Sequence, residues 1–218
     1  MSAARNAPAE PGASSYVSRG GLKLERALDV FRVDPARLRA LDAGASTGGF
    51  TDCLLRRGAA HVIAVDVAYG EFTWTLRNDD RVRLLERTNV RSLDLPALDE
   101  GPVDIVVADL AFISLRAVRD ALLAASTPEA DLVLLVKPQF EAPREQVERG
   151  GVVHDPAVWQ ETMRSVAASY REAGCELAGA TASPLVGPAG NREFFLHLRR
   201  DGADAGDAVI ARAIEAAP

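Results

Sequence analysis

The sequence predicts an α/β protein with a Rossmann-like, doubly wound and mostly parallel sheet, an antiparallel edge strand and helices on both faces. Hydrophobic runs alternate with amphipathic stretches along most of the 218 residues, which is typical of a parallel sheet covered on both sides. The first run ends in a small-residue turn at 44–49, and the second ends at an acid, Asp66. A strand, a Gly-rich turn, a helix and a strand ending in an acid form half of a nucleotide-binding unit.

The elements follow from periodicity and from residues that begin or end helices. An apolar stripe at helical spacing, starting after Ser18, predicts the first helix. Asp155 followed by Pro156 is typical of a helix N-terminus, because the carboxylate caps the helix and proline suits its first position. The other helices are expected at 49–57, 72–77, 115–125 and 156–173, and the strands at 39–41, 61–65, 82–86, 104–108, 132–136, 176–182 and 193–199. The last two strands are expected to pair partly antiparallel at one edge.

Length and composition predict one domain, at 16–200, between two tails. Residues 1–15 are rich in Ala, Pro, Ser and Gly and are expected to be disordered or a linker. Residues 201–218 are expected to form a C-terminal tail with a possible short helix. No apolar run approaches the roughly 20 residues of a membrane span. No signal peptide is visible, and the two cysteines lack metal-type spacing, so we expect a cytoplasmic protein without a metal site.

The charge distribution is uneven. The net charge of −6 argues against a general nucleic-acid binder. Residues 1–40, however, carry seven basic and four acidic side chains, a net charge of +3, which leaves −9 for the remainder. A local positive field can steer RNA even when the total charge is negative. An ordinary solvated helix face explains the basic segment equally well.

The turn at 44–49 predicts a ligand that lies against bare backbone. It does not read G-x-G-x-x-G and is not followed by a P-loop lysine, so a pyrophosphate is not favoured. Asp42, just before the turn, suits a cationic group. These features favour S-adenosyl-L-methionine, which carries an ammonium and a sulfonium and no phosphate. A Gly-rich turn alone occurs in many α/β proteins, but Asp66 lies where a carboxylate can accept hydrogen bonds from ribose hydroxyls.

Chemically active side chains gather at the predicted strand ends, where doubly wound sheets bind ligands. Asp109 and Lys137 each follow a predicted strand, and an antiparallel course would bring Glu193 to the same rim. A lysine held by carboxylates can orient a hydroxyl and accept its proton once it is partly neutralised. The alternative is a lysine that extends from a strand end into solvent. The long segment 137–155 is expected to be mostly irregular and to cover a substrate rather than to be disordered.

Six segments closely resemble the TlyA family. They are 16–24 (YVSRGGLKL), 42–52 (DAGASTGGFTD), 64–70 (AVDVAYG), 86–91 (ERTNVR), 108–115 (ADLAFISL) and 135–141 (LVKPQFE). The resemblance runs from about Tyr16 to Arg199. Members of this family are known as ribosomal-RNA 2′-O-methyltransferases, and some are known as hemolysins. The catalytic part is similar to the FtsJ type of Rossmann-like methyltransferase.

The resemblance implies a Lys-Asp-Lys-Glu tetrad around the target ribose hydroxyl. It assigns these roles to Lys23, Asp109, Lys137 and Glu193; spacing alone would make Lys23 a surface lysine. For the cofactor it implies Gly44, Ser46, Gly48, Gly49 and Phe50 at the methionine end, Asp66 and Val67 at the ribose, and Thr88, Asn89 and Val90 near the adenine. Asp109 would lie between the cofactor and the target.

The expected reaction is in-line methyl transfer to ribose in ribosomal RNA, free or in ribosomal subunits. Family members usually carry a small RNA-binding domain before the segment that begins at Tyr16, and here about fifteen residues precede it. We therefore expect either a catalytic fragment or docking that relies on a partner. Three alternatives stay open: a membrane-active hemolysin, a non-catalytic RNA-binding factor with this fold, and a methyltransferase for another RNA or a small molecule.

Overall fold

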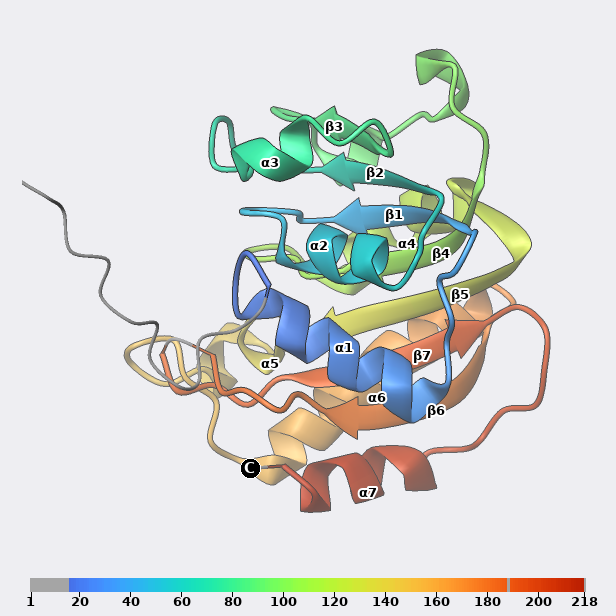
Figure 1. Cartoon of the computed structure of the whole chain (residues 1–218). Coiled ribbons are helices and arrows are strands. Elements are labelled where there is room, and N and C mark those ends of the chain that lie inside the picture. Colours follow the sequence, from blue (N-terminus) through green and yellow to red (C-terminus); the bar gives the residue numbers. More distant parts are fainter. Residues whose placement is uncertain (1–15, 188, 218) are drawn as a thin grey trace, which may run out of the picture.

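The computed structural model describes residues 16–187 and 189–217; the tail expected at 1–15 lies outside them. Seven strands form one sheet. They are β1 (Arg39–Ala43), β2 (His61–Val65), β3 (Val82–Leu85), β4 (Val103–Ala108), β5 (Ser126–Val136), β6 (Glu176–Ala182) and β7 (Phe194–Arg199). Their order in the sheet is β3-β2-β1-β4-β5-β7-β6 (Figure 1). The direction of strand addition reverses beside β1, and doubly wound sheets bind ligands at such a point.

The pairing confirms the predicted fold class. Strands β1 to β5 pair in parallel, whereas β7 is antiparallel to both β5 and β6. The antiparallel strand is therefore second from the edge, and β6 occupies the edge itself. This arrangement points the start of β7 toward the carboxyl ends of the parallel strands.

Helices cover both faces of the sheet (Figure 1). They are α1 (Gly20–Phe31), α2 (Gly49–Arg56), α3 (Trp74–Arg77), α4 (Leu115–Ala124), α5 (Pro138–Glu141), α6 (Pro156–Glu172) and α7 (Ala208–Glu215), with short 3-10 turns at Val90–Ser92, Pro96–Leu98 and Arg144–Gln146. Successive strand residues enter opposite cores because side chains alternate across a sheet. Ala40 packs with α1 and α2 through Leu28 and Leu54, and Leu41 packs with α4 and α6 through Val118 and Val166.

Two segments differ from the sequence pattern. Strand β5 begins at Ser126, six residues before the predicted start, because Ser126 pairs with Val103 of β4; an irregular register follows before Asp131 pairs with Ile105. The segment after Lys137 contains α5 and a 3-10 turn. Within 201–218, where a short helix is expected, α7 packs against β6 and buries Ile210 and Ala213.

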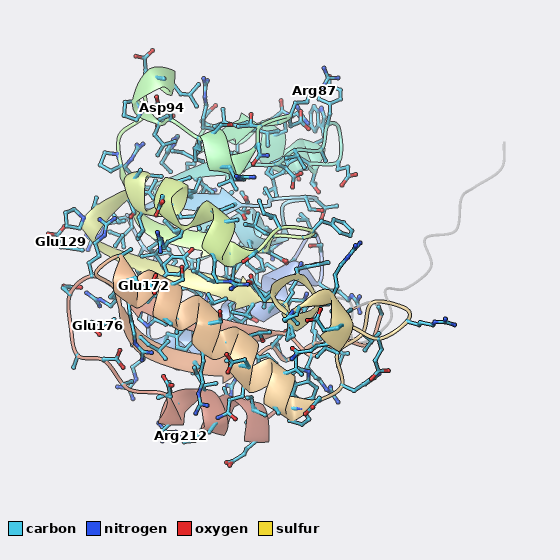
Figure 2. All side chains as sticks on the ribbon, turned by 180° about the vertical axis from the view of Figure 1, so that it is seen from behind. Arg87, Asp94, Glu129, Glu172, Glu176 and Arg212 are labelled. Carbon is cyan, nitrogen blue, oxygen red and sulfur yellow. The ribbon has the colours of Figure 1, made fainter. Side chains whose placement is uncertain are left out.

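Charged side chains are spread over the surface, from Arg87 and Asp94 near the β3 side to Arg212 on α7 (Figure 2). None of the helices in the described part of the chain has the length and apolar character that crossing a bilayer requires.

Candidate active site

The turn after β1 is held tightly against the ends of the neighbouring strands. The backbone amides of Gly44 and Ala45 both donate to the carbonyl of Val65, at 2.9 and 3.1 Å. Gly44 has a φ of +87°, and a Cβ at this position would lie 2.5 Å from the carbonyl oxygen of Asp109. Only glycine combines that backbone conformation with so close an approach. The first predicted glycine is thus needed to bring the turn against the end of β4.

The carboxylate of Asp66 organises the same turn. One oxygen accepts a hydrogen bond from the Ser46 amide at 2.7 Å, and the other accepts from the Ala68 amide at 2.7 Å. A carboxylate oxygen has more than one acceptor position, so these bonds leave capacity for hydroxyl donors. Asp66 also lines the cavity that the turn borders, where it is open to a ligand.

A cavity of about 690 Å³ opens at the carboxyl ends of the parallel strands, within the size range of small-molecule sites. Eight residues predicted to bind the cofactor line it: Gly44, Ser46, Asp66, Val67, Thr88, Asn89, Val90 and Asp109. Leu110, Phe112 and Ile113 add an apolar wall, and Lys137 lies at its border. The walls therefore combine carboxylate groups with apolar surface.

A smaller cavity of about 230 Å³ adjoins the first and is lined by Lys23, Gly49 and Phe50. Gly44, Ser46 and Asp109 line both cavities. The two spaces consequently meet at the Gly-rich turn and at Asp109. A ligand in one space would reach a ligand in the other at this junction.

Asp42 and Gly48 are not in the walls of either cavity. Asp42 is fully buried within β1; one carboxylate oxygen accepts a 2.7 Å hydrogen bond from the Thr51 hydroxyl, and the other has no partner among the described residues. Burial raises the pKa of Asp42 to about 7, and the charges of Asp109 and Asp66 add to the rise. A Cβ on Gly48 would lie 2.5 Å from Leu76. These two residues support the turn from behind.

The four predicted catalytic side chains form two ion pairs. Asp109 and Lys137 follow the adjacent strands β4 and β5, and the Lys137 amine lies 2.5 Å from the Asp109 carboxylate. Lys23, on α1, lies 2.6 Å from the carboxylate of Glu193, the residue just before β7. Lys23 and Asp109 line the same small cavity, so each ion pair contributes one side chain to its wall.

Residues 16–200 match the family of FtsJ-like methyltransferases. The chain belongs to this family. The Mycobacterium tuberculosis protein named 16S/23S rRNA (cytidine-2'-O)-methyltransferase TlyA is 55% identical over 185 residues, which cover 85% of this chain and 69% of that protein. Hemolysin A of Brachyspira hyodysenteriae is 36% identical over 183 residues, 84% of this chain and 76% of the relative. A solved structure from Streptococcus thermophilus superposes with a TM-score of 0.88 at 39% identity and covers 94% of this chain and 77% of that one. The resemblance predicted from the motifs is confirmed.

Lysine is rare and arginine is common in this FtsJ-like methyltransferase. Lys23 and Lys137 are the only lysines in the sequence, and every other basic side chain except histidine is arginine. Arginine keeps its proton in proteins, whereas a lysine can lose its proton in a suitable environment. Lys137 lines the larger cavity and Lys23 lines the smaller one, and Asp109 lines both. The scarcity of lysine in the sequence therefore singles out Lys23, which helical spacing alone does not.

Sequence reasoning also missed Glu141. Its side chain is almost completely buried behind the site, and burial raises the pKa of its carboxyl group against the opposing effect of its hydrogen bonds. The only signal in the sequence is its place in the segment Lys137–Glu141, four residues after the catalytic candidate.

Proposed function

We propose that this chain is an S-adenosyl-L-methionine-dependent methyltransferase that modifies ribose 2′-hydroxyl groups of ribosomal RNA. The observation that carries the proposal is the Lys137–Asp109 pair at the junction of two cavities. One cavity has walls suited to a nucleoside, and the other brings Lys23 to the same point. The name of the M. tuberculosis relative supports ribosomal RNA as the substrate, and such an enzyme would work in the cytoplasm.

The residues present fit the proposed cofactor. Asp66 would accept hydrogen bonds from the ribose hydroxyls, and Val67 would lie beside them. Thr88, Asn89 and Val90, with the apolar wall at Leu110 and Ile113, would hold the adenine. Gly44 and Ser46 would hold the methionine end, with the buried carboxyl group of Asp42 behind the turn. When bound, S-adenosyl-L-methionine supplies an electrophilic sulfonium methyl group.

The protein would contribute alignment and proton transfer. Lys137 would hold the 2′-hydroxyl by a hydrogen bond and, in its deprotonated form, take the proton from the oxygen as that oxygen forms its new bond to carbon. Asp109 would fix the amine and stabilise the ammonium that results. Lys23, held by Glu193, would position the ribose from the opposite side.

The rim of the site suits single-stranded or flipped nucleotides. Phe112 lines the larger cavity and is 91% exposed, and Tyr69, which is close in sequence to the cavity-lining Asp66, is also largely exposed. The Arg87 guanidinium lies 4.2 Å from the centre of the Tyr69 ring. Proteins recognise unpaired RNA bases by stacking on aromatic rings and arginine planes. These side chains therefore favour RNA over a small-molecule substrate.

The test is transfer of a tritiated methyl group from S-adenosyl-L-methionine to intact ribosomal subunits and to naked ribosomal RNA. Labelled RNA would then be mapped, and resistance of the labelled position to alkaline cleavage would identify a 2′-O-methyl group. Label on a base, or on a small molecule only, would contradict the proposal. The Hemolysin A name of one relative makes leakage from liposomes a useful parallel measurement, because a membrane-active protein would cause leakage without the cofactor.

A further inference from the structure

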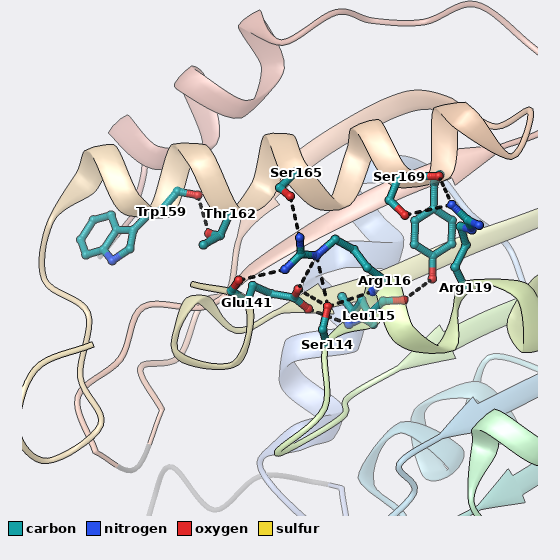
Figure 3. A network of polar contacts seen from close by, with 10 residues as sticks. Ser114, Leu115, Arg116, Arg119, Glu141, Trp159, Thr162, Ser165 and Ser169 are labelled. Atoms are coloured by element: carbon teal, nitrogen blue, oxygen red, sulfur yellow. Dashed lines mark hydrogen bonds and ion pairs between the residues drawn. The ribbon is translucent and has the colours of Figure 1, made fainter. Parts of the chain in front are cut away.

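Glu141 makes a dense set of polar contacts on the buried side of the site (Figure 3). Its carboxylate accepts a hydrogen bond from the Leu115 amide at 2.6 Å and one from the Ser114 hydroxyl at 2.5 Å. The Arg116 guanidinium lies 3.4 Å from the same carboxylate. The Glu141 side chain is only 2% exposed. A buried carboxylate is costly unless it is paired in this way.

These bonds join the two segments that carry Asp109 and Lys137. Ser114 ends the segment that begins at Asp109, after β4, and Glu141 ends the helical turn that follows Lys137, after β5. Arg116 strengthens the junction, because it also donates to the Glu141 carbonyl at 3.1 Å. Its other end donates to the Ser165 hydroxyl on α6 at 3.0 Å. The ends of two strands are thereby tied to each other and to a long helix.

Capping of α4 does not explain why Glu141 is there. Ser114 is already the N-cap residue, since its hydroxyl accepts a hydrogen bond from the Arg116 amide at 3.1 Å. A carboxylate at the positive end of a helix adds a favourable interaction, but an acidic residue within α4 could supply the same interaction without crossing to another segment. The specific consequence of Glu141 is the connection between the two loops.

The same two loops meet a second time at the exposed rim. The rings of Phe112 and Phe140 are 5.1 Å apart, and Phe112 is 91% exposed. Because Phe112 is so exposed, this aromatic contact restrains the two loops weakly compared with buried charge-assisted hydrogen bonds. The buried contact at Glu141 is therefore the firmer of the two connections.

We propose that Glu141 is a positioning residue, which fixes the Lys137 amine relative to the Asp109 carboxylate by tying together the loops after β4 and β5. Glu141 lies outside the walls of both cavities. It therefore acts through these loops and not by contact with a ligand. The proposal rests on the proposed function of the Lys137–Asp109 pair.

The kinetic test compares Glu141→Ala, Glu141→Asp and Glu141→Gln under saturating cofactor and RNA. A displacement of about 1 Å at reacting groups costs about 10²-fold in rate, so we expect kcat of Glu141→Ala to fall by about 10- to 100-fold. The KM for S-adenosyl-L-methionine should change less than about threefold. Glutamine keeps an acceptor for the Leu115 amide and a donor for Ser114, so Glu141→Gln should recover most of the activity. The shorter Glu141→Asp should be intermediate, which keeps the test informative should the alanine variant fail to fold.

A matched control is Arg119→Ala. Arg119, also on α4, donates to the Ser169 carbonyl on α6 at 2.9 Å, so its loss weakens the same helix contact without touching either loop. We expect kcat within about twofold of the wild type. Equal losses of kcat in Arg119→Ala and Glu141→Ala, or wild-type kcat in Glu141→Ala, would overturn the proposal.

A second measurement does not depend on methyl transfer. Because the chain has only two lysines, brief treatment with acetic anhydride followed by mass spectrometry reports the reactivity of Lys137 relative to Lys23. This ratio should rise at least about threefold in Glu141→Ala and stay unchanged in Arg119→Ala. A rise in the ratio with no methyl transfer by the wild type would uphold the positioning role and reject the proposed function. An unchanged ratio in an active enzyme would reject the positioning role alone.

Discussion

The two ion pairs at the junction of the cavities differ in how they are built and how open they are. Lys137 and Asp109 extend from neighbouring parallel strands, with side chains 14% and 21% exposed. Lys23 and Glu193 are 170 positions apart in sequence, and the carboxylate of Glu193 is only 3% exposed. The first pair faces the larger cavity, where a proton can be exchanged. The second pair has a closed carboxylate, which suits holding Lys23 in place.

The contrast between the two pairs predicts that Lys137, in the more exposed pair, carries out the proton transfer. We expect Lys137→Ala to lower kcat by about 10²- to 10⁴-fold, the usual contribution of a general acid–base group. The dissociation constant for S-adenosyl-L-methionine, measured by titration calorimetry, should change less than about threefold because the residues proposed to hold the cofactor are unchanged. Wild-type turnover in this variant would remove the proposed role of Lys137.

Unlike the four side chains of the two ion pairs, the buried carboxyl group of Asp42 has a hydrogen bond but no ion-pair partner among the described residues. Its protonation should therefore change the stability of the protein with pH. Its pKa rises from 3.8 to about 7 on folding, so between these values the native state binds more protons than the unfolded state. Stability conferred by the protonated carboxyl is thus present below about pH 4 and is lost as the pH rises through 7. The loss is about 4 kcal/mol at 1.36 kcal/mol per unit. Asp42→Asn should remove that change.

The measurement is the free energy of unfolding in urea at pH 4 and pH 8 for the wild type and for Asp42→Asn. Subtracting the variant isolates Asp42 from the other titrating groups. A wild-type minus variant difference that is the same at both pH values would show that the carboxyl is ionised in the native protein throughout this range.

The closed pair should matter more for stability than the open pair. Lys23→Ala leaves the Glu193 carboxylate, which is 3% exposed, without its partner, and removal of one partner from a buried pair costs about 3 kcal/mol or more. Lys137→Ala leaves the Asp109 carboxylate, which is 21% exposed and can be solvated from the cavity, so this variant should lose less, about 1.5 kcal/mol. Urea unfolding at pH 7 checks both values. Equal losses in the two variants would erase the distinction between the pairs.

The different origins of the Lys137–Asp109 and Lys23–Glu193 pairs explain how much of the site could be predicted from the sequence. Strand-end placement brought Asp66, Asp109 and Lys137 together because parallel strands end at a common rim. The position of Lys23 depends on how α1 packs on the sheet, and no local pattern encodes that packing. Its assignment therefore came from the family resemblance. Glu141 was missed because its partners lie in a different loop and its role exists only in three dimensions.

The burial of Asp42 is a second feature that the sequence alone did not predict. Its place at the first turn was evident from the sequence, but the hydrogen bond to Thr51 and its complete burial depend on α2 covering the strand. Sequence spacing placed it near a ligand, whereas the structure places it behind the turn. Similarly, β5 began earlier than predicted because polar residues can pair at the end of a strand that its hydrophobic pattern does not reach.

The smallest expected effect concerns the cofactor side of the junction. Asp66→Asn replaces one of two acceptor oxygens with a donor, so the bond to the Ser46 or the Ala68 amide is lost and the negative charge facing the proposed ribose disappears. A hydrogen bond to a charged group contributes about 1.5–3 kcal/mol, which predicts a rise of about tenfold or more in the cofactor dissociation constant. The value of kcat at saturating cofactor should stay within about twofold.

The double variant Asp66→Asn/Lys137→Ala shows whether the two sides are separate. If Asp66 acts only on cofactor binding and Lys137 only on proton transfer, the two losses in kcat/KM should multiply within a factor of about two, as expected for independent sites. A smaller combined loss would mean that the turn held by Asp66 also sets the position of Asp109, since the Gly44 turn contacts the Asp109 backbone directly. In that case the turn would contribute to the geometry of both the cofactor site and the Lys137–Asp109 pair.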